Sequence, residues 1–188
     1  MKQLTFDEVM LIWLEAEINK IEGRDILPVA QSKGFSSITE WRLATALRLG
    51  LDKKQWVLEA VSDPAKTLPN IIVGPYQGWS KFFDNKLVTT FEEAMEIPEF
   101  FEWCQAHDRV VPLAKNFPLP TKLIVLRKEN GQLIHIEGGH RICAVAFANK
   151  IGKPIDFSKS EINIAVATIN DEEIPQLLDF LRTGSSKN

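Results

Sequence analysis

The chain has 188 residues, of which 45% are hydrophobic and 25% are charged, so it is long enough for one large domain or two small ones. The formal net charge is -3, and this weak acidity gives no global argument for a nucleic-acid-binding or membrane-binding surface. No internal repeat or low-complexity block is present.

Two capping boxes mark helix starts near the N-terminus. Thr5-Phe6-Asp7-Glu8 opens a helix with apolar residues at helical spacing, and Ser37-Ile38-Thr39-Glu40 opens another. Gly50 supplies a left-handed stop for the second of these helices, and a third helix is expected over residues 53–61. The sequence therefore predicts a helical subdomain over residues 1–66.

This helical subdomain carries a candidate basic face. A glycine-containing turn joins the second and third predicted helices, as in the helix-turn-helix units that contact DNA. The cations of this face are Arg42, Arg48, Lys53 and Lys54. Acidic residues on the same helices reduce the net positive charge of this face. We therefore favour a solvated polar surface, and DNA is not the favoured partner.

A second domain is expected over residues 67–183, beginning with a strand at Ile71-Ile72-Val73. The next eight residues, Gly74 to Lys81, contain two glycines, a proline and two aromatic residues, a composition typical of a loop. Such a loop either lines a ligand site or is a tight turn whose aromatic residues pack on the core, and both alternatives stay open. Its candidate ligand contacts, by stacking on a base or reaching a phosphate, are Tyr76, Trp79 and Lys81.

Further helix and strand signals follow this loop. Thr90-Phe91-Glu92-Glu93 is a capping box, and Pro98 interrupts or restarts the helix that it opens. From Val110 the pattern turns extended. Near the C-terminus, alternation predicts a strand over Ile162–Ile169, followed by a short helix over residues 171–182 and a disordered tail over residues 184–188.

The dipeptide Asn130-Gly131 lies between two apolar runs, which is the strongest short signal for a β-hairpin. With these two residues as the loop, the register places Leu126 opposite His135 and Ile124 opposite Glu137. Glu137 is then a carboxylate at the end of a mainly apolar strand. We interpret it as a general base or metal ligand, the alternative being an acid satisfied by backbone N–H groups.

The segment from Leu133 to Lys150 has the layout of a phosphate site. A strand runs into Gly138 and Gly139, and an apolar helix begins directly after them. Glycines let the backbone approach a ligand closely, and the first N–H groups of a helix favour an anion. Arg141 could then form bidentate hydrogen bonds with phosphate oxygens, and His140 could donate or transfer a proton. Solvated polar surface is the alternative.

In this context, Gly138-Gly139-His140-Arg141-Ile142-Cys143-Ala144 resembles the G-G-H-R-x-x-A turn of the ParB/sulfiredoxin-like superfamily, and the resemblance covers about residues 70 to 170. It implies an α+β fold in which a mixed-sheet domain follows the helical subdomain. It also implies a nucleotide (ATP, ADP or CTP), with Glu137 as the residue that would hold an accompanying Mg²⁺. The residues that would hold the phosphates are Gly138, Gly139, His140 and Arg141.

Two departures from this family narrow the expected function. Sulfiredoxins carry the catalytic cysteine immediately before His-Arg, where this chain has Gly139, so sulfinic-acid reductase activity is not expected. The ParB-type DNA clamps carry a basic helix-turn-helix after the nucleotide domain, whereas here the helical unit precedes it. Cys143 lies one turn further along the helix and is expected to be a buried, inert thiol.

Three functions stay open. The first is a phosphotransferase or nucleotide hydrolase, with Glu137 and His140 as catalytic residues. The second is a nucleotide-gated adaptor that contacts DNA or protein through the helical unit, and the third is a purely structural member of the family. Cys104 and Cys143 show neither C-x-x-C nor zinc spacing, and no basic signal segment or long apolar run occurs. We therefore expect a cytoplasmic protein without membrane attachment.

Overall fold

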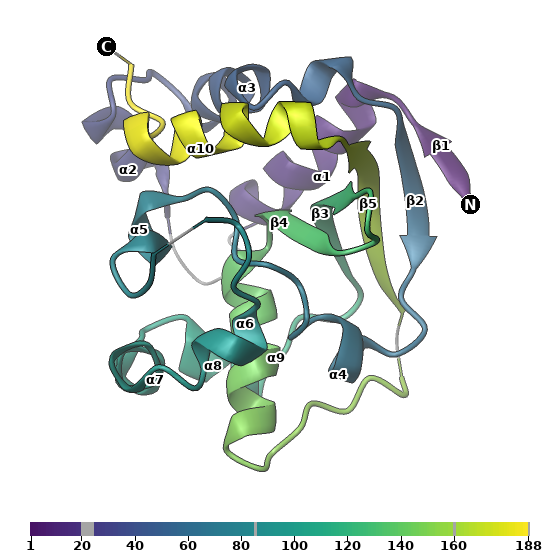
Figure 1. Cartoon of the computed structure of the whole chain (residues 1–188), viewed down its shortest axis with the longest axis vertical. Helices are drawn as coiled ribbons and strands as arrows, with labels where there is room; N and C mark the ends of the chain where they lie inside the picture. Colours follow the sequence, from purple (N-terminus) through teal and green to yellow (C-terminus); the bar gives the residue numbers. More distant parts are fainter. Residues whose placement is uncertain (20–24, 85, 160, 188) are drawn as a thin grey trace.

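The computed structural model describes residues 1–19, 25–84, 86–159 and 161–187. Its centre is a mixed five-stranded sheet with the strand order β1-β2-β5-β3-β4 (Figure 1). Strands β3 and β5 are parallel, and the other neighbouring strands are antiparallel. The strands are β1 (Lys2–Leu4), β2 (Trp56–Ala60), β3 (Thr121–Lys128), β4 (Leu133–Glu137) and β5 (Ile162–Ile169). The predicted α+β class is confirmed.

Helices cover both faces of this sheet, which gives three layers (Figure 1). One face packs against α1 (Phe6–Ile18), α3 (Ile38–Arg48) and α10 (Ile174–Thr183). Successive side chains of β3 point to opposite faces, so Ile124 and Leu126 enter this core. Among the described residues, none of the helices combines the length and apolarity needed to cross a bilayer.

The opposite face of the sheet packs against a second group of helices, and Leu123 and Val125 of β3 enter this second core. Its central element is α9 (Gly139–Lys150), in which eight consecutive residues from Arg141 to Ala148 are buried. This agrees with its apolar sequence, which predicts a helix enclosed by other layers. The surrounding helices are α6 (Phe91–Ala94), α7 (Pro98–Ala106) and α8 (Val110–Lys115).

Five short elements complete the described chain. They are α2 (Leu27–Ser32), η1 (Leu51–Lys53), α4 (Pro64–Thr67), α5 (Gln77–Ser80) and η2 (Asp171–Glu173). The loop containing α5 passes close to the end of β4, because the Tyr76 hydroxyl donates to the Ile136 carbonyl over 2.6 Å. The predicted Gly74 to Lys81 loop thus contains one helical turn and contacts the strand that leads into α9.

The N-terminal prediction is correct for two helices and wrong for the third. Thr5 and Glu8 form the full capping box of α1, and Ser37 caps α3 by accepting from the Glu40 N–H. Gly50 has a φ of +69° directly after α3. The predicted helix over residues 53–61 is instead η1 and strand β2, which pairs with β5. Residues 1–66 therefore supply two strands of the central sheet, and the boundary at residue 66 stays a prediction.

Three further expectations differ from the structure. Residues 71–73 form no strand, and only Ile72 makes isolated bridges, one to Thr90 and one to Ile134 of the edge strand β4. Residues 110–115 are helical rather than extended. The segment 184–187 of the predicted disordered tail is placed against the N-terminal helices, where the Lys187 N–H donates to the Lys33 carbonyl over 2.9 Å. This backbone hydrogen bond holds the C-terminal segment in place.

The β3–β4 hairpin exists, but its loop is one residue longer than predicted. The Lys128 N–H donates to the Gln132 carbonyl over 2.8 Å, and Gly131 has a φ of +85°, so residues 129–131 form a three-residue loop. Val125 therefore lies opposite His135, and the predicted pairing of Leu126 with His135 is wrong. An irregularity after Ile124 then restores the predicted pairing of Ile124 with Glu137.

Candidate functional site

A cavity of about 360 Å³ lies where the end of β4, the α5 loop and the N-terminal helices meet. This volume is within the range of small-molecule binding sites. The residues that line the cavity include Tyr76, Trp79, Glu137, Gly138, Gly139 and His140, all of which are candidate site residues from the sequence. The cavity lining does not include Lys81 or Arg141, so the structure brings together most but not all of the predicted residues.

The turn at Gly138 and Gly139 requires glycine at both positions. Gly138 has a φ of +89°, and a Cβ atom there would overlap the Leu123 side chain. A Cβ atom on Gly139 would lie 2.6 Å from His135 Nε2. Helix α9 starts directly at this turn, and its N-cap residue Gly138 has no side chain to cap the first N–H groups. The positive end of the helix dipole therefore faces the cavity lining.

His135 is a buried side chain beneath this turn. Its Nδ1 atom accepts a hydrogen bond of 2.5 Å from the Gly74 N–H, and its ring contacts Phe91 with 5.2 Å between ring centroids. Because a backbone N–H can only donate, the neutral imidazole carries its proton on Nε2, which faces Gly139. His135 thus fixes the spacing between the α5 loop and the glycine turn.

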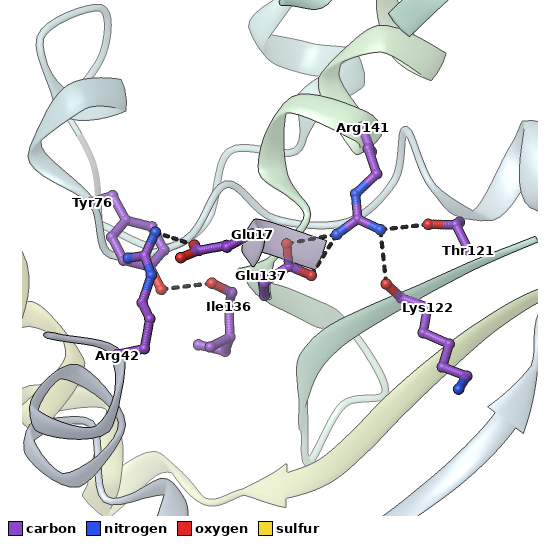
Figure 2. A network of polar contacts seen from close by, with 8 residues as sticks. All are labelled: Glu17, Arg42, Tyr76, Thr121, Lys122, Ile136, Glu137 and Arg141. Carbon is purple, nitrogen blue, oxygen red and sulfur yellow. Dashed lines mark hydrogen bonds and ion pairs between the residues drawn. The ribbon is translucent and has the colours of Figure 1, made fainter. Parts of the chain in front are cut away.

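Glu137 and Arg141 form a buried ion pair at the start of α9 (Figure 2). Arg141 Nη2 lies 2.6 Å from both carboxylate oxygens of Glu137, and the side chains are 7% (Glu137) and 1% (Arg141) exposed. Arg141 Nη1 donates to the Thr121 hydroxyl and, over 2.9 Å, to the Lys122 carbonyl. The guanidinium therefore joins β4 and α9 to strand β3, instead of lying at the surface of the cavity.

This pair also decides how well Glu137 suits a metal ion. Both of its oxygens accept from a cation, so its negative charge is already neutralised. Among the described residues, no three His, Cys, Asp or Glu side chains are grouped as a metal site. The arrangement does not fit a resident Mg²⁺ held by Glu137.

His140 lines the cavity with its ring held between two aromatic neighbours. Its centroid is 5.2 Å from that of Trp79 and 5.1 Å from that of His107. The Arg109 N–H donates to His107 Nδ1 over 3.1 Å, and the Arg109 side chain also lines the cavity. Sequence patterns do not indicate Arg109, because it reaches the cavity only through the packing of α8 against α9.

The aromatic residues of the α5 loop line the cavity and pack on the core at the same time. Trp79 is 6% exposed and packs edge-on against Phe91 and Trp103. Burial raises the pKa of Tyr76 above its ordinary value, so its hydroxyl stays protonated and donates to β4. Lys81 lies instead over the rings of Phe82 and Trp103, outside the cavity.

The far wall of the cavity comes from the N-terminal helices and was not predicted as part of a site. Arg42 is stacked on the Trp41 ring, 3.8 Å from its centroid, and forms an ion pair with Glu17 (Figure 2). The atoms Glu17 Oε2, Arg42 Nε and Trp41 Nε1 are buried and have no hydrogen-bond partner among the described residues. Each such group costs about 1–3 kcal/mol if it stays unsatisfied.

The predicted basic face is therefore not a continuous surface. Arg42 lies in the cavity wall, and Lys54 forms an ion pair with Glu173 while only 8% of its side chain is exposed. Arg48 lies over the Phe180 ring and donates to the Thr183 hydroxyl. These three side chains are engaged within the fold, so they do not form the candidate basic face, which was not the favoured interpretation of the sequence.

The two cysteines lie inside the core, as expected for Cys143. Their Sγ atoms are 3.5 Å apart between α7 and α9, and both residues are fully buried. Burial raises the pKa of the Cys143 thiol well above its ordinary value. Neither thiol lines the cavity, so neither is placed as a nucleophile for a ligand bound there.

The chain matches no family model, no curated protein and no solved structure. Its resemblance to the ParB/sulfiredoxin-like superfamily, carried by the Gly138–Arg141 turn, therefore stays a prediction.

Proposed function

We propose that the protein binds a small phosphorylated ligand in the cavity, with the phosphate at the Gly138–His140 turn. The observation that carries this proposal is a helix start without a side-chain cap, opening onto a cavity of about 360 Å³ that Arg109 also lines. The N–H groups and dipole of a helix start favour an anion, and an arginine can form paired hydrogen bonds with phosphate oxygens.

The Glu137–Arg141 pair supports this proposal electrostatically. An unpaired carboxylate next to the turn would repel a phosphate, whereas Glu137 is neutralised by two contacts of 2.6 Å to Arg141. Arg141 therefore acts on the ligand as a positioning residue that holds the turn against β3. The direct cationic contact comes from Arg109 in this proposal.

The ligand class agrees with the nucleotide-binding role that the family resemblance implies. If the protein is a phosphotransferase or hydrolase, His140 is the better candidate for proton transfer, because Glu137 is engaged by Arg141 and His140 lines the cavity. The stacking of His140 between Trp79 and His107 would hold its ring in one orientation at the phosphate.

The test is calorimetric titration of the full chain with sodium tripolyphosphate. We expect saturable binding to the wild type and a loss of about tenfold or more in Arg109→Gln, since a hydrogen bond to a charged group contributes about 1.5–3 kcal/mol. Arg182→Gln is the matched control, because its side chain is 77% exposed and outside the cavity lining. Equal losses in both variants, or no binding to the wild type, would contradict the proposal.

A second candidate function is a nucleotide-gated adaptor that contacts a protein partner. One observation favours it: apolar side chains on α1 and α3 are exposed, with Leu11 at 64%, Ile18 at 59% and Leu47 at 49%. Turnover separates the two candidates. Hydrolysis of ATP, ADP, CTP or GTP that falls in His140→Asn supports an enzyme, whereas binding without turnover leaves the adaptor ahead.

A further inference from the structure

We propose that the cavity wall formed by Glu17, Trp41 and Arg42 is a nucleobase subsite, which makes the phosphorylated ligand a nucleoside phosphate. This inference rests on the proposed function, because it places the base in the part of the same cavity that the phosphate does not occupy. The wall and the Gly138–His140 turn line one continuous cavity, so one ligand can reach both.

The first argument is the unmatched hydrogen-bonding capacity of this wall. Glu17 Oε2 is an acceptor, while Arg42 Nε and Trp41 Nε1 are donors, and all three lack a partner among the described residues. Native proteins leave few buried polar groups unsatisfied, so three in one wall indicate a missing partner. Trp41 is only 6% exposed and lines the cavity, so this partner must come from the cavity side or from within the protein.

One acceptor and two donors together require a partner that can both donate and accept hydrogen bonds. Phosphate oxygens can accept from Arg42 and Trp41, but a fully ionised phosphate has no hydrogen to donate to Glu17. The edge of a nucleobase carries N–H donors beside ring nitrogen or carbonyl acceptors, so a single base can satisfy an acceptor and two donors together. An anion bound at this wall would instead face an unsatisfied carboxylate.

The third argument is the apolar surface next to these polar groups. Trp13, Tyr76 and Phe180 also line the cavity. The Arg42 guanidinium lies 5.3 Å from the Trp13 ring centroid, and the Tyr76 and Phe180 rings pack edge-on against each other. The flat face of a base packs favourably on aromatic side chains, whereas a free phosphate offers no such face. Aromatic lining and a mixed donor and acceptor set therefore occur together at one end of the cavity.

The test compares ATP, CTP, GTP and UTP with sodium tripolyphosphate by calorimetry on the full chain. We expect at least one nucleotide to bind the wild type about tenfold or more tightly than tripolyphosphate, the gain expected from one hydrogen bond to a charged group. In Glu17→Gln this advantage should shrink, while tripolyphosphate affinity stays unchanged or rises slightly. Glu15→Gln is the matched control, since Glu15 is exposed on the same helix.

Trp41→Phe provides a second variant, because it keeps an aromatic ring and removes only the indole N–H donor. Thermal melting shows whether each variant is folded. Equal binding of all four nucleotides and tripolyphosphate to the wild type would refute the base subsite, as would a nucleotide advantage that survives both substitutions; in either case the phosphate site stands. Failure of both tripolyphosphate and nucleotides to bind would overturn the proposed function and this inference with it.

Discussion

Replacing both members of the Glu137–Arg141 pair should destabilise the protein by less than the sum of the two single replacements. The perturbations are Glu137→Leu, Arg141→Met and the double variant. Each single change leaves a charge buried without its partner, which costs about 3–5 kcal/mol in other proteins. The double change leaves no charge, although the Thr121 hydroxyl and the Lys122 carbonyl lose Arg141 as a hydrogen-bond donor.

The structure also predicts which single change is worse. Glu137 lines the cavity, so after Arg141→Met its carboxylate can take a proton or contact water. Arg141 is 1% exposed, and a guanidinium cannot lose its proton near neutral pH. We therefore expect Glu137→Leu to lower the free energy of unfolding by about 5 kcal/mol and Arg141→Met to lower it by about 3 kcal/mol, the two ends of the range for broken buried ion pairs.

The assay is urea unfolding of the four proteins, monitored by circular dichroism. The double variant should lose about 2–3 kcal/mol less than the sum of the single variants, which is the coupling expected for residues in direct contact. Strictly additive losses would show that the ion pair contributes no coupling. A larger loss in Arg141→Met than in Glu137→Leu would refute the argument from exposure.

Three further predictions concern other parts of the molecule. Gly138→Ala should lower the melting temperature more than Gly131→Ala, because both glycines have φ near +85° to +89° but only a Cβ at position 138 meets another side chain within 4 Å; equal shifts would contradict this. The hydrogen bond from Lys187, with others from Ser36, lowers the pKa of Glu40 from 4.5 to about 2. Its folded pKa lies below the unfolded one, so this stabilisation is present above pH 4.5 and lost as the pH falls towards 2. NMR titration of Lys187→Met should show a raised Glu40 pKa, and an unchanged value would exclude the contact. Finally, a thiol reagent should label Cys143 only after denaturation, because the native thiol is fully buried; rapid labelling of the native protein would contradict that burial.

Features that depend on neighbouring residues could be predicted from the sequence. The capping boxes at Thr5 and Thr90 form as expected, because each closes hydrogen bonds within four residues. The glycine turn before α9 also forms, because Gly138 can adopt the positive φ that this turn requires. The hairpin and its Ile124–Glu137 pair agree with the sequence prediction, but the pairing of Leu126 with His135 is wrong, because the loop at Gly131 is one residue longer.

Features that depend on distant partners could not be predicted. Strand β2 has the length and composition of a short helix, and its state is decided by pairing with β5, more than one hundred residues later in the sequence. The same limit applies to the candidate site. Glu17 and Arg109 carry no local motif, and only the three-layer packing brings them to the cavity that Gly138 also lines.

Arg141 shows why a cation beside a glycine turn is ambiguous in a sequence. The pattern alone indicates a phosphate contact, yet the first turn of α9 directs this side chain towards oxygen atoms of Glu137, Thr121 and Lys122. A deeply buried guanidinium needs hydrogen-bond acceptors, and these three groups accept from its Nη1 and Nη2 atoms at the junction of β3, β4 and α9. The pair therefore neutralises the carboxylate nearest the turn and fixes the backbone there. If an anion binds this turn, its counter-charge must then come from other elements, which is why Arg109 on the segment before α8 is the residue to test first.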